Sequence, residues 1–245
     1  MGNTTSSKIL QLQQPAIWML ARRRFTKSML LEVENLHYTI NENPLFSRFN
    51  LAIEEGNHHL LVGPSGSGKT TLINLTCGLL SPEKGAIRVA GHDMAAVSES
   101  GRDKIRREHI GIVFQTLRLV SALDLSANLL LAQRLSRGTT DAPLIASLLE
   151  RLGIAHRAKA KPHQMSQGEA QRAAIARALV TRPRLLIADE PTSALDESNA
   201  QQVADLLLEC AADYGVTLLI ATHDDRLKPL FPNQIALTDH MLKAA

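Results

Sequence analysis

The sequence predicts an α/β fold with a mostly parallel sheet, an N-terminal antiparallel β subdomain and an inserted α-helical subdomain. Three observations support this prediction. A short apolar strand at residues 60–62 runs into a glycine-rich loop and then into a helix. In the second half of the chain, continuous apolar strands alternate with helical segments, which is typical of a parallel sheet buried on both faces. Between these regions, residues 120–160 carry helical runs and no strand pattern.

The glycine-rich loop matches the phosphate-binding pattern G-x-x-x-x-G-K-[ST] and follows a strand, as that motif requires. Its glycines let the backbone N–H groups wrap around a polyphosphate, and the positive end of the next helix adds attraction. Lys69 supplies a charge for the outer phosphates, and the Thr70 hydroxyl can ligate Mg²⁺. The pattern favours a P-loop NTPase core over a glycine-rich turn that binds nothing. The candidate phosphate-binding residues are Gly63, Pro64, Ser65, Gly66, Ser67, Gly68, Lys69, Thr70 and Thr71.

The strand and helix patterns can be followed in order from residue 30. The strand-like segments before residue 100 are 31–36, ended by Tyr38, then 45–53, 57–62 and 86–90. The helix after the loop should end near Gly78, and Arg102 to His109 is a charged segment expected at the surface. A buried strand is expected from Ile110 to Phe114.

The second half of the chain begins with the helical block. Helices are expected at 125–135, 141–152, 166–179 and 198–214, and strands at 185–188 and 216–222. Asp141 should cap the second of these helices, which ends before Gly153. Ser166 and Glu169 form the S-x-x-E pattern of a capping box at the start of the third.

Composition places limits on the class of protein. The chain has 245 residues, enough for one large α/β domain, and its two cysteines, Cys77 and Cys210, lie in apolar helical patterns. We interpret them as buried residues of a protein in a reducing compartment. No apolar run is long enough to span a membrane, so a membrane would have to be reached through a partner.

The basic character of the chain comes from its N-terminus. The net charge is +3, but residues 1–29 hold five basic residues and no acid, which leaves 22 basic against 24 acidic residues in the rest. A broad nucleic-acid-binding surface is therefore not indicated, and no nucleic-acid partner is expected.

Residues 1–29 form a basic extension that we expect to be disordered, and residues 30–245 form one domain with a helical subdomain at about 118–170. A short amphipathic membrane anchor, a transit peptide, or an upstream extension of a protein that starts at Met29 are the alternatives.

Two neighbouring carboxylates follow an apolar strand. Asp189 comes after four apolar residues, where it can orient Mg²⁺, and Glu190 can polarise an attacking water. A helix cap is the other reading of such an acidic pair, but a phosphate loop in the same chain favours the metal anchor.

Taken in order, six motifs resemble those of ATP-binding-cassette (ABC) ATPases, from about Leu30 to the end of the chain. They are Tyr38, Gln115, the signature-like Met165-Ser166-Gln167-Gly168-Glu169-Ala170-Gln171-Arg172, the strand Leu185 to Asp189 with Glu190, Ser193-Ala194-Leu195-Asp196, and His223. The resemblance implies ATP and Mg²⁺ as cofactors. It implies adenine stacking by Tyr38 and a metal and γ-phosphate contact by Gln115. It adds Ser166, Gly168, Glu169 and Asp196 to the nucleotide-binding residues, assigns catalysis to Glu190, His223 and Lys69, and assigns the metal to Thr70, Gln115 and Asp189.

The signature departs from the family pattern L-S-G-G-[QE]-x-Q-R at two positions. Gln167 replaces the first glycine and Met165 replaces the leucine, whereas Ser166 and Gly168 are kept. The longer side chain of Gln167 is expected to affect the rate of hydrolysis more than the function itself.

The resemblance also implies partners. In this family, two ATPase domains pair head to tail and hold ATP between the phosphate loop of one and the signature of the other. The predicted partners are therefore a second copy and an integral membrane permease, with the chain peripheral at the cytoplasmic face of the inner (plasma) membrane. Residues 106–115 and Glu169 resemble the lipoprotein-releasing and macrolide-efflux group.

Two alternative functions remain at this stage. One is a soluble ABC-type mechano-ATPase acting on nucleic acid or ribosomes, although such proteins usually carry tandem cassettes or inserts. The other is a P-loop kinase, in which the signature and the segment 193–196 would have no role.

Overall fold

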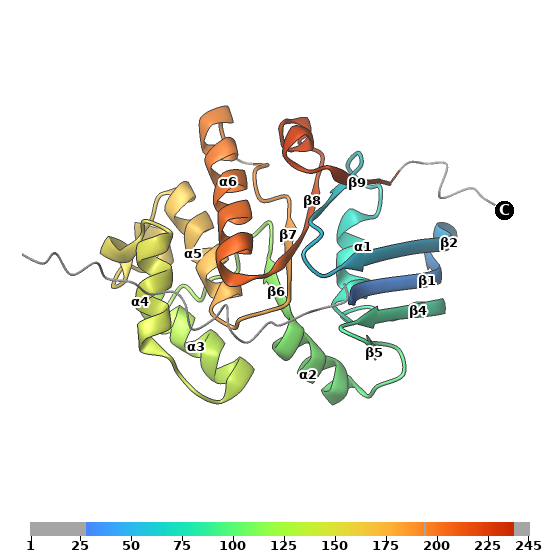
Figure 1. Cartoon of the computed structure of the whole chain (residues 1–245), viewed down its shortest axis with the longest axis horizontal. Coiled ribbons are helices and arrows are strands. Elements are labelled where there is room, and N and C mark those ends of the chain that lie inside the picture. The colour runs from blue at the N-terminus through green and yellow to red at the C-terminus, as the bar shows by residue number, and fades with distance from the viewer. Residues whose placement is uncertain (1–27, 194, 238–245) are drawn as a thin grey trace, which may run out of the picture.

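The computed structural model describes residues 28–193 and 195–237. The extension predicted at residues 1–29 therefore lies, except for its last two residues, outside the described part. The expected α/β fold is confirmed: a parallel sheet, an antiparallel sheet and helices pack together, as Figure 1 shows.

The parallel sheet has five strands in the order β6-β7-β8-β3-β9. Its strands are β3 (His59–Val62), β6 (Ile110–Val113), β7 (Leu185–Asp189), β8 (Thr217–Thr222) and β9 (Asn233–Ala236). Every residue of β7 and β8 is buried, which explains their continuous apolar sequence. Because the carboxyl ends of parallel strands meet at one edge, this sheet brings the ends of β3, β7 and β8 together.

The antiparallel sheet has the order β2-β1-β4-β5 and is built from β1 (Met29–Ile40), β2 (Asn43–Glu54), β4 (Lys84–Val89) and β5 (His92–Asp93). The first strand continues beyond Tyr38, where we expected it to end. It continues because Asn41 (φ 49°) and Glu42 (φ 65°) form a tight two-residue turn that pairs Ile40 with Asn43.

Helix α1 (Lys69–Thr76) lies between the two sheets, whereas α5 (Gln167–Leu179) and α6 (Glu197–Tyr214) pack on the parallel sheet. Helix α1 packs against β4 of one sheet and β7 and β8 of the other. Helix α5 packs against β6, and helix α6 packs against β8. The charged segment before β6 is a helix, α2 (Glu99–His109), which the sequence reading did not predict. Only Ile105 of that helix is buried, so the apolar periodicity is weak there.

The region between β6 and α5 is helical, as expected. It holds α3 (Leu125–Arg137), α4 (Ala142–Arg151) and the short 3₁₀ helices η1 (Ala155–Arg157) and η2 (Pro162–Gln164). The Asp141 side chain accepts a hydrogen bond from the Leu144 amide, which confirms the predicted cap. A last 3₁₀ helix, η3 (Asp225–Leu230), leads to β9, and neither was predicted.

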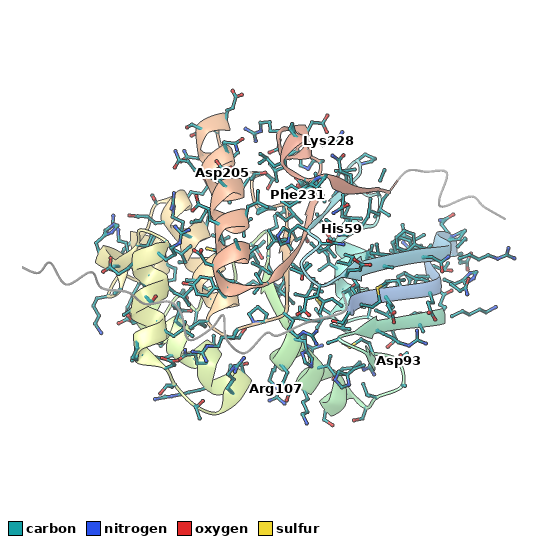
Figure 2. The ribbon with its side chains drawn as sticks, viewed as in Figure 1. His59, Asp93, Arg107, Asp205, Lys228 and Phe231 are labelled. Carbon is teal, nitrogen blue, oxygen red and sulfur yellow. The ribbon has the colours of Figure 1, made fainter. Side chains whose placement is uncertain are left out.

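Apolar side chains fill the interior between these elements, as Figure 2 shows. Phe231, which is 1% exposed, points into this interior, whereas Asp205 is exposed on the outer side of α6. None of the helices in the described part of the chain is long and apolar enough to cross a membrane.

Candidate nucleotide-binding and hydrolysis site

The phosphate loop joins β3 to α1 and depends on glycine at defined positions. Gly66 (φ 82°) and Gly68 (φ 93°) have left-handed backbone that favours glycine. A Cβ atom at Gly63 would lie 2.5 Å from Ser67 Oγ and 2.7 Å from the carbonyl oxygen of Leu237. Within the described residues, the buried Ser67 hydroxyl has no hydrogen-bond partner. The loop is therefore tightly wound and keeps an unused polar group, as a phosphate cradle would.

Lys69 points back into this loop. Its side chain is only 6% exposed, and its Nζ atom donates hydrogen bonds to the carbonyl oxygens of Gly63 (2.7 Å) and Pro64 (3.0 Å). The same Nζ lies 3.4 Å from Glu190 Oε1. The ammonium group thus sits at the centre of the loop, where the negative charge of a phosphate would also be placed.

Thr70 and Asp189 bring a hydroxyl and a carboxylate together from α1 and β7. The Thr70 hydroxyl donates to Asp189 Oδ2 at 3.0 Å, whereas Oδ1 is buried without a partner among the described residues. Burial raises the pKa of Asp189, the Thr70 hydrogen bond opposes this shift, and the nearby Glu190 charge adds to it. The unpartnered oxygen, paired with a hydroxyl, fits a divalent cation whose remaining ligands are phosphate oxygens and water.

Glu190 follows at the end of β7 in a left-handed backbone conformation, with φ 52°. Its Oε2 atom accepts from the Thr222 hydroxyl (3.0 Å) and the His223 amide (3.3 Å), and Oε1 lies 2.9 Å from His223 Nδ1. Burial raises the pKa of Glu190, but the hydrogen bonds from His223 and Thr222 outweigh burial and leave the pKa lowered. This carboxylate is therefore charged and oriented, which suits it to polarise a water.

A second network beside this carboxylate was missed by the sequence reading. The buried Thr192 hydroxyl donates to Asp224 Oδ2 at 2.8 Å, and the Arg226 guanidinium makes two hydrogen bonds to the same carboxylate. The Arg226 hydrogen bonds lower the pKa of Asp224 to about 2, with help from Thr192. Since Asp224 follows His223, this network fixes the segment that carries His223. The His-Asp pair directly after a strand is the sequence signal that could have indicated it.

The signature segment lies at the N-terminus of α5 and forms the predicted capping box. Glu169 Oε2 accepts from the Ser166 amide at 2.8 Å, and the Glu169 amide donates to Ser166 Oγ. The Glu169 carboxylate also accepts from Arg157 (2.7 Å) and contacts His156 (3.1 Å), and the Arg157 hydrogen bond is the main reason that its pKa falls to about 2. Glu169 thus holds the helical region against α5. By contrast, a Cβ at Gly168 would meet open space.

Three other predicted residues occupy separate positions. Tyr38 lies on β1 opposite Phe46 and packs against the apolar cluster of the antiparallel sheet. Gln115 is exposed in the turn after β6. Asp196 caps α6 by accepting from the Asn199 amide at 2.9 Å. The contacts described above join five predicted residues into one cluster: Lys69, Thr70, Asp189, Glu190 and His223. Tyr38, Gln115, Asp196 and the signature residues make none of these contacts.

A phosphate loop, a hydroxyl–carboxylate pair and a charged carboxylate beside them are the features expected in a P-loop enzyme that binds and hydrolyses a nucleoside triphosphate. The family model described as ABC transporter matches residues 46–193, more than half of the chain. The chain belongs to this family: it is an ATP-binding subunit of an ABC transporter, with ATPase activity.

Relatives of known name support the same assignment. The lipoprotein-releasing system ATP-binding protein LolD of Hydrogenovibrio crunogenus is 37% identical over 217 residues, which is 86% of this chain and 94% of that protein. The ABC transporter ATP-binding protein YtrE of Bacillus subtilis is 34% identical over 83% of this chain and 89% of that protein.

Solved structures give the same fold. The ATP-binding cassette MJ0796, in a dimeric post-hydrolysis state bound to ADP and Pi, has a TM-score of 0.77 and 31% identity, covering 86% of this chain and 95% of its own. The protein cbiO1 of Clostridium perfringens, part of the ABC transporter complex cbiONQ, has a TM-score of 0.77 and 30% identity, over 85% of this chain and 84% of its own.

Proposed function

We propose that two copies of this chain pair head to tail, bind Mg²⁺-ATP between them, and use its hydrolysis to drive an integral membrane permease. The observation that carries this proposal is the cluster of Lys69, Thr70, Asp189, Glu190 and His223 at the carboxyl edge of the parallel sheet. No nucleic-acid partner is expected.

Each residue of the cluster has a defined role in this reaction. Thr70 and Asp189 would hold the Mg²⁺ ion, which supplies charge neutralisation at the phosphates. Lys69 would release the loop carbonyls and bind phosphate oxygens, because a charged acceptor competes well with neutral carbonyls. Glu190 would orient water and take its proton, while His223 would hold the terminal phosphate.

A second copy would complete the site. In Figure 1, α5 begins on the side of the helical region, with strands of the parallel sheet between it and α1. The signature of one copy is therefore proposed to reach the phosphate loop of the other, where Ser166 and the space beside Gly168 can receive phosphate. Tyr38, Gln115, Glu169 and Asp196 are kept as proposed nucleotide-site residues, but the ion pairs of Glu169 indicate an indirect contribution.

The membrane partner is proposed from the family and from the transporter names of the relatives. The chain would lie peripherally at the cytoplasmic face of the inner membrane, and the region at about 118–170 would contact the permease. Gln115 lies at the junction of this region with the parallel sheet, so it could pass the nucleotide state between them. Because the LolD proteins are among the relatives, a permease of the lipoprotein-releasing type is the first candidate.

The proposed pairing can be tested by replacing Glu190 with glutamine. The amide can still accept from Thr222 and the His223 amide at the position of Oε2, so the site should fold. Hydrolysis should fall by about 10²–10⁴-fold, as expected for loss of a general base.

The uncleaved ATP should then hold two copies together, so the Glu190→Gln chain should elute from a sizing column as a dimer with Mg²⁺-ATP and as a monomer with Mg²⁺-ADP. A chain that stays monomeric with Mg²⁺-ATP would contradict the shared site. The soluble alternative would be supported by co-sedimentation with ribosomes and no recovery of a multi-span protein from membranes.

A further inference from the structure

The Thr222 hydroxyl at the end of β8 lies between Glu190 and Asp224. It donates to Glu190 Oε2 at 3.0 Å and accepts from the Asp224 amide at 2.9 Å. Because an amide N–H can only donate, the Thr222 oxygen must be the acceptor toward Asp224, and its single hydrogen is left for Glu190. Thr222 is fully buried, so water does not compete for this hydrogen. The direction of the hydroxyl toward the carboxylate is therefore fixed.

These contacts belong to a closed ring of hydrogen bonds. The Asp224 carboxylate accepts from the hydroxyl of Thr192, and Thr192 stands two residues after Glu190 in the chain. The ring thus leaves the Glu190 side chain through Thr222 and returns to the Glu190 backbone through Thr192. Thr192 is also fully buried, and Arg226 balances the charge of Asp224. A ring of satisfied, buried polar groups leaves the Glu190 carboxylate little freedom to turn.

The backbone of Glu190 is held as well. Its left-handed conformation (φ 52°) begins a turn in which the Glu190 carbonyl accepts from the amide (3.3 Å) and the hydroxyl (3.1 Å) of Ser193. The Glu190 amide donates to the Ala221 carbonyl of β8 at 2.7 Å. The backbone is therefore fixed on both sides, and the carboxylate reaches Thr222 from a defined position.

The two carboxylate oxygens of Glu190 have different neighbours. Oε1 lies near Lys69 Nζ (3.4 Å) and His223 Nδ1 (2.9 Å), the two groups that are proposed to bind phosphate. Oε2 accepts from the Thr222 hydroxyl and the His223 amide, which have no such role. When phosphate draws the Lys69 and His223 side chains away, Oε1 becomes free for water while Oε2 keeps its hydrogen bonds. A general base needs this arrangement, with one oxygen anchored and the other open.

We propose that Thr222 is a positioning residue for hydrolysis: its hydroxyl holds Oε2 of Glu190, so that Oε1 is aimed at the attacking water. This inference rests on the proposed function, in which Glu190 orients that water and takes its proton. In this role Thr222 contacts neither phosphate nor metal, and it acts through Glu190 alone.

The test compares the ATPase activity of the full chain carrying Thr222→Val with that of wild type, across pH and with Mg²⁺-ATP. Valine keeps the branched shape that suits a buried strand but lacks the hydroxyl. At the upper plateau of the pH profile, kcat should fall about tenfold, as expected for the loss of one hydrogen bond to a charged group, while KM for ATP changes less than about twofold. Thr222→Ser keeps the hydroxyl and should restore most of the rate. A plateau kcat of Thr222→Val equal to that of wild type would overturn the proposal.

Two further readouts separate positioning from general damage to the fold. Burial raises the pKa of Glu190, and the hydrogen bonds from His223 and Thr222 lower it, so loss of the Thr222 hydroxyl should move the acidic limb of the rate profile to higher pH. In the Glu190→Gln background, Thr222→Val should change the residual rate, measured in a single turnover, by less than about twofold, because the carboxylate on which it acts is gone. The same tenfold loss in both backgrounds would show that Thr222 acts elsewhere and would overturn the proposal.

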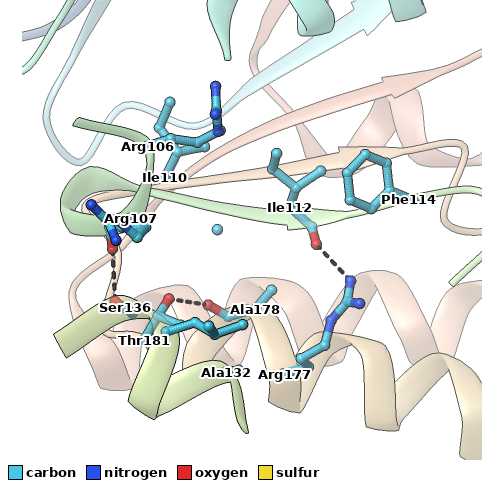
Figure 3. Close-up of a pocket in the computed structure, with 12 residues that line it drawn as sticks. Arg106, Arg107, Ile110, Ile112, Phe114, Ala132, Ser136, Arg177, Ala178 and Thr181 are labelled. Atoms are coloured by element: carbon cyan, nitrogen blue, oxygen red, sulfur yellow. Dashed lines mark hydrogen bonds between the residues drawn. The ribbon is translucent and has the colours of Figure 1, made fainter. Parts of the chain in front are cut away.

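Two matched controls remove one hydroxyl hydrogen bond each. Thr217, buried on the same strand, accepts from the Gly56 amide at 2.8 Å, and Thr181, after the end of α5, donates to the Ala178 carbonyl at 3.0 Å, as Figure 3 shows. Neither is hydrogen-bonded to Glu190 in the described part of the chain, so Thr217→Val and Thr181→Val should keep kcat within about twofold of wild type. A tenfold loss in these controls as well would contradict a specific role of Thr222.

The proposed function fails on a different measurement. A Glu190→Gln chain that stays monomeric with Mg²⁺-ATP contradicts the shared site, whereas equal rates of wild type and Thr222→Val contradict only the role of Thr222.

Discussion

Replacing Asp189 with asparagine should stabilise the nucleotide-free protein while removing its activity. In wild type, one oxygen of this buried carboxylate bonds to Thr70 and the other has no partner among the described residues. An asparagine oxygen can keep the Thr70 hydrogen bond, and the buried charge disappears. An unpartnered buried neutral group costs about 1–3 kcal/mol, and an unpartnered charged group costs more. The new amide also lacks a partner but carries no charge, so we expect a net gain of about 1 kcal/mol. For a chain of this size, that gain raises Tm by about 2–4 °C.

The gain should depend on pH in a defined direction. Burial raises the pKa of Asp189, so the unfolded chain releases this proton at a lower pH than the folded protein does. The penalty in wild type is therefore absent below the unfolded pKa of about 4, and grows as pH rises toward the folded pKa. The stability difference between Asp189→Asn and wild type should be larger at pH 8 than at pH 4, which lies near the unfolded pKa.

The assay is urea unfolding without nucleotide and with a chelator, at both pH values. The matched control is Asp224→Asn, because Asp224 is held by Arg226 and Thr192 and its pKa lies at about 2. Its charge stabilises the fold above the unfolded pKa, and that stability is lost as pH falls toward 2, so the control should be less stable than wild type at pH 8. An Asp189→Asn chain that is less stable than wild type at pH 8 would refute the reasoning.

Three further changes test other parts of the structure. Lys69→Ala should bring ATP binding, measured with a fluorescent nucleotide, below detection, and retained affinity would count against the role of the loop. Gly111→Ala should cost about 1–3 kcal/mol in chemical unfolding, because its Cβ would lie 2.7 Å from the Ala178 carbonyl oxygen and 2.9 Å from Pro183 Cγ; an unchanged midpoint would contradict this close packing. Deleting residues 1–28 should leave the ATPase rate intact, and a lost rate would show that this extension takes part in the reaction.

The features that the sequence predicted well depend on neighbours within a few residues. The turn at Gly68 and the capping box of Ser166 and Glu169 each follow from the chemistry of one short segment. The alternation of apolar strands and helices likewise predicted the parallel sheet, because burial on both faces leaves a continuous apolar run.

The features that it missed depend on contacts between distant segments. Helix α2 has one buried residue and therefore a weak helical pattern, and the short strands β5 and β9 exist only through pairing with their neighbours. The Thr192–Asp224 hydrogen bond joins residues that no sequence spacing relates.

The left-handed backbone at Glu190 limits which substitutions can give a folded but catalytically inactive variant. Any side chain at this position carries a conformational cost of about 1–2 kcal/mol, and a β-branched one carries more. Asparagine or glycine adopts such a backbone at little cost. Valine would strain the backbone and with it the hydrogen bond, 2.7 Å long, that the Glu190 amide donates to the Ala221 carbonyl. A valine substitution would therefore perturb the fold as well as remove the carboxylate, so its effect on activity could not be assigned to the loss of the carboxylate alone.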